Sequence, residues 1–129
     1  MEKHDFGILT GIIGFVTSLW LGLDVAAQAL LVLMAADIVT GVLAGGKAGE
    51  LDSEVSYRGM RKKAMQVVLV ALATYLGSLP QVGLPLGDGV AWAFCGTEVL
   101  SVLENADRLG VKMPQPVVDA MKRLGGKVY

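Results

Sequence analysis

The sequence has almost none of the residues on which enzymes and metal sites most often depend. It contains one cysteine, Cys95, and one histidine, His4, among 129 residues. A single cysteine excludes an internal disulfide and leaves no ligand spacing typical of a zinc site. No serine or cysteine stands beside a base, and no glycine-rich phosphate loop is present. The sequence therefore predicts a protein that is not an enzyme and needs no cofactor.

Charged residues are also scarce, at 18% of the chain, whereas hydrophobic residues make up 53%. Soluble domains carry about 25% charged residues. A soluble domain of this size leaves much of its surface exposed, so it could not hide so much apolar surface from water. The mean hydropathy of +0.58 therefore indicates that lipid covers the protein. The net charge of −1 gives no overall field that would attract nucleic acid.

Four apolar segments are candidates for membrane-spanning helices. The first two are long enough, because a membrane helix needs roughly 17 to 25 residues. The other two are shorter and would span with help from flanking turns or local thinning of the bilayer. We expect an all-α integral membrane protein with a single domain over 1–129, spans at about 6–23, 25–43, 64–79 and 89–103, a polar loop at 44–63 and a polar tail at 104–129.

The distribution of Lys and Arg predicts the topology. The connections around Asp24 and over 80–88 contain no basic residue, whereas the 44–63 loop and the tail are rich in them. Cytoplasmic loops carry an excess of Lys and Arg, so four spans with both termini in the cytoplasm are favoured. Three spans, with the first segment on the membrane surface, are the alternative. The basic residues expected to set the topology at the end of the loop are Arg61, Lys62 and Lys63.

Small residues recur at helical spacing in the first segment. In lipid, helices associate through close backbone approach and polar contacts, because no hydrophobic effect drives them together. A stripe of small residues therefore predicts a helix-packing face, within one subunit or between subunits. The stripe consists of Gly7, Gly11, Gly14, Ser18 and Gly22, and a shorter version in the fourth segment consists of Gly89, Ala93 and Gly96.

Two carboxylates, Asp37 and Glu98, lie inside predicted spans. Asp37 lies six residues before Leu43, the end of its segment, and Glu98 lies six residues before Glu104, so both sit about 9 Å inside the same cytoplasmic boundary. An unpaired charge there would cost roughly 2.5 to 3.5 kcal/mol, so neither should face lipid. Three interpretations remain open: polar contacts to Thr40, Thr97 or neighbouring helix ends, ion translocation, or the lining of a water-filled lesion formed by many copies.

The tail predicts a short amphipathic helix. Pro114 and Pro116 suit its first turn, and glycines follow at 125 and 126. Val117 and Met121 share one face with Leu124, whereas the basic residues of this segment lie off that face. Basic residues beside an apolar stripe fit contact with the anionic inner leaflet. Simple solvation and topology-setting explain them as well.

Three motifs resemble those of the toxin-secretion and phage-lysis holins, which are small multi-span membrane proteins. LLVLMAADIVTG is similar to an apolar segment of the family with an aspartate and a nearby Thr-Gly. SYRGMRKK resembles its polar loop, and GTEVLSVLENADRLGVKMP resembles its Ser-x-x-Glu-Asn and Gly-x-x-x-Pro pattern. Thr97 stands where the family usually has Asn, and Ile38 where an aromatic residue is frequent. The matching polar and small residues are Asp37, Thr40, Gly41, Glu98, Ser101, Glu104, Asn105, Gly110 and Pro114.

The resemblance implies a protein that accumulates in the cytoplasmic membrane of a bacterial host, forms homo-oligomers and opens large non-selective lesions. Such lesions let a murein-degrading endolysin, or a secreted toxin, cross without direct binding. The matching residues then become candidates for assembly or for lining the lesion. An antiholin or membrane adaptor, which binds a holin and makes no hole, and a small ion or metabolite transporter are the alternatives.

Overall fold

The computed structural model describes residues 3–50 and 52–129, and these ranges contain five helices and no strand. The prediction of an all-α fold is confirmed. Three of the helices, by length and composition, could cross a membrane: α1, α2 and α4. The helices are α1 (Lys3–Leu21), α2 (Val25–Ala48), α3 (Ser53–Ser78), α4 (Leu86–Arg108) and α5 (Gln115–Arg123).

The helix ends follow ordinary capping chemistry. The Asp24 carboxylate accepts the Ala27 N–H at 2.8 Å and begins α2. Asp52 does the same for α3 through the Glu54 N–H at 2.9 Å. Gly49 ends α2 with a φ of 68°, in the left-handed region that glycine adopts without steric cost.

The structure differs from the sequence prediction over 44–63, which was expected to be a loop. Only residues between Ala48 and Ser53 separate α2 from α3, so most of this stretch is helical. Hydropathy detects where apolar residues stop, whereas Ala, Glu, Arg, Lys and Met continue a helix equally well in water. Both helices therefore extend past the apolar segments that revealed them.

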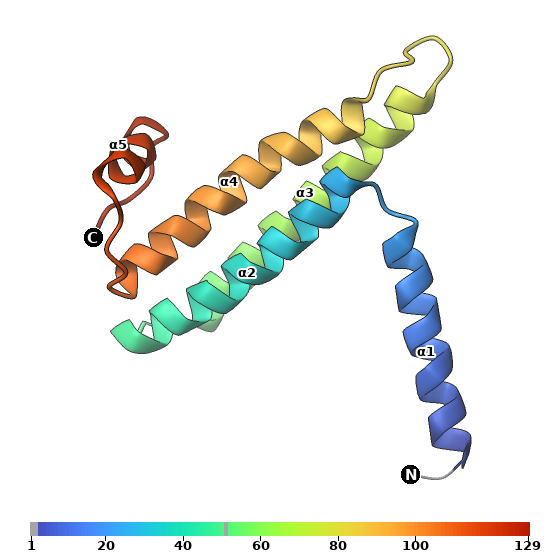
Figure 1. Cartoon of the computed structure of the whole chain (residues 1–129), viewed down its shortest axis with the longest axis horizontal. Helices are drawn as coiled ribbons and strands as arrows, with labels where there is room; N and C mark the ends of the chain where they lie inside the picture. The colour runs from blue at the N-terminus through green and yellow to red at the C-terminus, as the bar shows by residue number, and fades with distance from the viewer. Residues whose placement is uncertain (1–2, 51) are drawn as a thin grey trace.

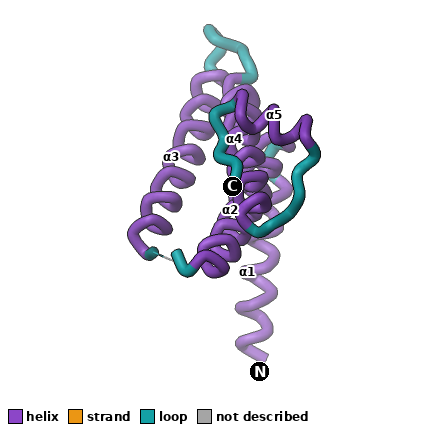
Figure 2. The backbone as a smooth tube through the Cα atoms, turned by 90° about the vertical axis from the view of Figure 1, so that its left-hand side faces the viewer, coloured by secondary structure: helices purple, strands orange, loops and turns teal. Residues whose placement is uncertain are grey.

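Three helices form a bundle in which α4 is central. Both α2 and α3 pack on α4, and α2 and α4 run in the same direction with α3 antiparallel to them (Figures 1 and 2). The core of this bundle is small and consists of apolar side chains from α2 and α4. Its buried members are Ala26, Leu30, Met34, Ala91 and Cys95.

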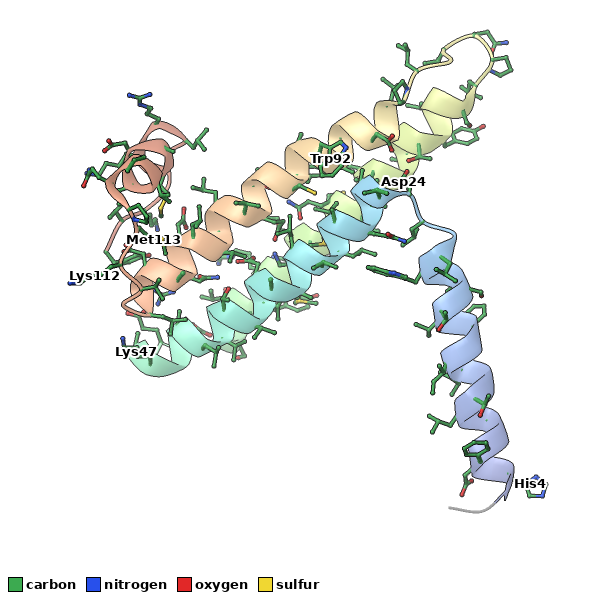
Figure 3. All side chains as sticks on the ribbon, in the orientation of Figure 1. His4, Asp24, Lys47, Trp92, Lys112 and Met113 are labelled. Atoms are coloured by element: carbon green, nitrogen blue, oxygen red, sulfur yellow. The ribbon has the colours of Figure 1, made fainter. Side chains whose placement is uncertain are left out.

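Helix α1 diverges from the bundle, and His4 lies at its far end (Figures 1 and 3). None of its span is buried inside the chain. A hydrogen bond from Gln28 Nε2 to the Trp20 carbonyl, at 2.9 Å, ties its end to α2. A Cβ added at Gly7, Gly11 or Gly14 would meet nothing within 4 Å. The small-residue stripe therefore makes no helix contact within the chain at these positions.

Helix α3 is not among the three candidate spans. Its apolar part follows Lys63, whereas its first ten residues are mostly polar or small and are all exposed. Since α3 leaves the end of α2 and returns to the start of α4, its apolar part runs alongside theirs.

The close approach of α4 to α3 occurs at Gly87, outside the small-residue stripe predicted for this segment. A Cβ at Gly87 would lie 2.0 Å from Thr74 Oγ1 and 3.0 Å from Thr74 Cα. Gly89 and Gly96, which belong to the predicted stripe, have open space around them. Only at Gly87 does the backbone of α4 need the absence of a side chain.

We expect Gly87→Ala to lower the free energy of unfolding by about 1 to 3 kcal/mol, the usual penalty of overpacking. Thermal unfolding of the purified chain in detergent measures it. Gly89→Ala is the matched control, because it adds the same methyl group in open space and raises helix propensity. Equal stability of the two variants would contradict the close contact.

Candidate functional site

A lysine of α3 joins two carboxylates in the interior of the bundle. Lys63 Nζ lies 2.6 Å from Asp37 Oδ2 of α2 and 2.5 Å from Glu98 Oε2 of α4. The three side chains are 13%, 14% and 5% exposed, respectively. We call Lys63, Asp37 and Glu98 the charged cluster. It links all three helices of the bundle through one ammonium group.

Helix register explains why the two acids meet. Asp37 and Glu98 each lie twelve residues after the first residue of their helix. The two helices are parallel, and Asp24 and Asp88 at their starts line the same depression. A rise of 1.5 Å per residue then brings both carboxylates to the same level, about 18 Å along the bundle.

A second polar layer lies one to two turns nearer the end of the bundle. Asn105 Nδ2 of α4 donates to Asp37 Oδ1 at 2.9 Å and to Thr40 Oγ1 at 3.0 Å. Thr40 in turn donates to the Ala36 carbonyl at 2.8 Å. Gly41 lies beside this layer, and a Cβ there would approach Asn105 Nδ2 to 3.5 Å. Asp37 therefore holds α2 to both of the other helices.

The ends of α2 and α4 are joined by further polar contacts. Lys47 Nζ donates to the Leu109 carbonyl at 3.0 Å, and Arg108 pairs with Glu50 at 2.8 Å. Figure 3 shows Lys47 at this end, near the connection that carries Lys112. Partial exposure of the Arg108–Glu50 pair makes its contribution small, about 1 kcal/mol or less.

The remaining residues predicted from the family motif have separate positions. Glu104 Oε1 accepts the Lys127 N–H at 3.2 Å and so anchors the tail to α4. Ser101 is half-buried on α4. Thr97 donates to the Phe94 carbonyl of its own helix and does not reach Glu98. The structure thus brings together Asp37, Thr40, Gly41, Glu98 and Asn105 but not Ser101 or Glu104.

The main residue that the sequence interpretation missed is Lys63. It was expected, with Arg61 and Lys62, to set the topology, and it was not identified as the partner of the two acids. Its two neighbours are exposed, and Arg61 stacks over the Tyr57 ring at 5.1 Å. Lys63 differs because it shares a helix face with Gln66, which is buried. A basic residue one turn before a glutamine that stands within an apolar segment was the signal available in the sequence.

Gln66 extends the polar interior by one turn toward the apolar core. It is 4% exposed, and its Oε1 is the buried side-chain oxygen or nitrogen without a hydrogen-bond partner among the described residues. Buried polar atoms are nearly always paired, since an unpaired one costs about 1 to 3 kcal/mol. The cluster and Gln66 together give the bundle a polar interior that packing alone does not require.

The chemistry available to this site is electrostatic. Within residues 3–50 and 52–129, no group of three His, Cys, Asp or Glu side chains could hold a metal ion. Two carboxylates facing one ammonium carry a formal charge of −1 when all are ionised. Such a group can fix helices relative to one another, and it can hold water if the helices separate.

Sequence comparisons find similar proteins in bacteria and in a bacteriophage. An uncharacterised 14.9 kDa protein of Clostridium perfringens is 34% identical over 105 residues, which cover 81% of this chain and 80% of that protein. An uncharacterised protein of Listeria monocytogenes is 33% identical over 92 residues, 71% of this chain and 66% of that protein. A probable holin of Bacillus phage phi105 is 29% identical over 71% of this chain and 68% of its own length.

The alignment spans just under two thirds of the length of the Listeria relative. No solved structure matches the chain. The family model of the bacteriophage holin family matches residues 14–126. This range includes the whole charged cluster and the polar layer beside it. This chain therefore belongs to the bacteriophage holin family.

Proposed function

We propose that the protein is a holin that assembles in the bacterial cytoplasmic membrane and opens non-selective lesions. An endolysin, or a toxin in a secretion system, would then cross without binding the chain directly. Membership of the family and a probable holin among the relatives support this proposal. The observation that carries it is the charged cluster buried between apolar helices.

The interior of the bundle in a single copy is filled by side chains. Leu30, Met34 and Cys95 fill the bundle interior and are each at most 6% exposed. Interiors packed in this way leave few voids larger than water. A lesion that passes a folded enzyme must therefore form between copies, with each subunit contributing a wall. The interior charges of dispersed subunits are the polar groups available to such a wall.

The cluster supports a two-state mechanism. In the dispersed subunit, Lys63 neutralises much of the charge of Asp37 and Glu98, which lowers the cost of keeping them within the membrane. On assembly, rotation or separation of the helices would turn these groups toward water and exchange the internal ion pairs for hydration. Hydration would offset the loss of the pairs because buried ion pairs gain little net energy over solvated ions.

We further propose four spans with both termini in the cytoplasm. If α2 and α4 cross the membrane in the same direction, α3 must cross it in the opposite direction. Its crossing part would begin at Lys63, whose charge is paired within the bundle. Polar ends of the bundle near Lys47 and Arg108 fit the cytoplasmic side. The N-terminal helix α1 then crosses beside the bundle, where its small-residue stripe is free for helices of other copies.

The first prediction concerns activity in cells. Induced expression in a bacterium should cause an abrupt loss of membrane potential, followed by lysis only when an endolysin is also expressed. A potential-sensitive dye and culture turbidity measure the two events. Slow, selective ion flux would instead favour a transporter. Delayed lysis by a coexpressed holin, with no effect of the chain alone, would favour an antiholin or adaptor.

The second prediction concerns the charged cluster. Asp37→Asn and Glu98→Gln should each change the time at which membrane potential is lost, because each weakens a tie between helices. Lys63→Met should have a larger effect, since breaking a buried pair by removing one partner costs about 3 to 5 kcal/mol. Timing is measured at matched protein levels in the membrane.

Exposed residues of α3 provide matched controls for the cluster variants. Glu54→Gln removes a carboxylate from a pair with Arg58 whose side chains are 80% and 71% exposed. Lys62→Met removes an exposed ammonium next to Lys63. Both controls should keep the normal schedule. If the cluster variants also kept it, the buried charges would have no part in triggering.

The third prediction concerns α1. Gly11→Leu and Gly14→Leu should leave insertion intact but shorten the ladder of crosslinked oligomers, because added side chains prevent close helix approach. Ile12→Phe, which adds bulk to another face of the exposed helix, is the control. Full ladders from the glycine variants would remove α1 from the assembly interface.

A further inference from the structure

An apolar groove separates α5 from α4 on the outside of the bundle. Its volume is about 330 Å³, within the range of roughly 300 to 1,000 Å³ found for small-molecule sites. Both helices contribute only apolar side chains and one glycine to it. The lining includes Gly96, Leu100 and Leu103 of α4 and Val117, Ala120 and Met121 of α5.

Contacts of the chain that follows α5 fix this helix beside α4. The tail after α5 is fixed to α4 through the Glu104 carboxylate, and Arg108 stacks over Tyr129 at 5.4 Å. Met121 is the deepest contact of α5, at 1% exposure, whereas Ala120 beside it is exposed. The groove is therefore accessible at Ala120 and closed at Met121.

The depth of the groove matches the upper part of a lipid leaflet. The predicted cytoplasmic end of the fourth span is at Leu103, and Gly96 is seven residues, or about 10 Å, farther in. Amphipathic helices at membrane surfaces bury their apolar face about 5 to 10 Å into the boundary between headgroups and acyl chains. An open apolar groove at this depth faces acyl chains.

The charges beside the groove favour one class of headgroup. Lys122 and Arg123 follow Met121 directly and are exposed. Over residues 109–129, four basic side chains stand against one acidic side chain, Asp119, whose carboxylate is bonded to Gln115 Nε2. The segment that forms the groove is therefore basic, whereas the whole chain has a net charge of −1.

We propose that the groove between α4 and α5 binds an anionic phospholipid of the inner leaflet. One acyl chain lies along Leu100, Leu103 and Ala120, and the headgroup is attracted by Arg123, with Lys122 adding positive charge to the same turn of α5. The bound lipid would fill the space between α4 and α5 and so stabilise the position of α5 at the membrane surface. This inference requires that the chain reside in a membrane, and it does not require that the chain make lesions.

The full chain, extracted from nanodiscs with equal amounts of phosphatidylglycerol and phosphatidylcholine of the same acyl chains, provides the test. Native mass spectrometry counts the retained lipids. We expect phosphatidylglycerol to be retained about tenfold over phosphatidylcholine, as two basic groups at an anionic surface allow. Ala120→Trp, which fills the groove, should abolish retention. Lys122→Gln with Arg123→Gln should remove the preference for phosphatidylglycerol.

Ala93→Trp is the control for added bulk, because Ala93 is exposed on α4 outside the groove. Lys62→Gln is the control for lost charge. Equal lipid retention in Ala120→Trp and Ala93→Trp would overturn the proposal. Crosslinking between copies through Ala120→Cys at high lipid content would also overturn it, since a second copy would then occupy the groove. Lysis is not measured, so the outcome is independent of the holin proposal.

Discussion

The arrangement of the bundle depends on one ammonium group shared by two carboxylates. In lipid, apolar side chains gain nothing by leaving the solvent, so polar contacts and close packing must determine how helices sit together. Lys63 meets Asp37 and Glu98 only in the observed register, because a slide of one helical turn would separate the charges by about 5.4 Å. Asn105 adds a second tie to Asp37. The cluster therefore specifies which side chains face inward along all three helices.

This constraint explains how a bundle with a small apolar core can be both ordered and poised to change. Leu30, Met34 and Cys95 fill the interior on one side of the charged cluster. Gln66 places an unpaired acceptor between these apolar side chains and the charged cluster. A purely apolar interface would offer no gain on contact with water. A polar interior stays closed while its groups satisfy one another, and it tolerates water when they separate. In the proposed assembly, the same residues would stabilise the isolated subunit and then face the water of the lesion.

The sequence predicted the helical class, the tail helix and the common level of the two acids, because hydropathy and residue counting report on each helix separately. It did not identify Lys63 as the partner, since a basic residue at the start of an apolar segment is also typical of a topology signal. It also placed a loop over 44–63, where charged residues that favour helices continue α2 and α3. No sequence feature predicts the divergence of α1. Its small-residue stripe predicts a helix contact but does not identify the surface with which the stripe makes contact.

The divergence of α1 gives each subunit two unlike parts, an extended arm and a packed body (Figure 1). An arm that docks on the body of the next copy makes a head-to-tail contact, and such contacts need not close after a fixed number of subunits. Rings and open arcs of many sizes then share one interface. The width of the resulting opening would be set by how many subunits have gathered, and a small protein could surround an area far larger than itself.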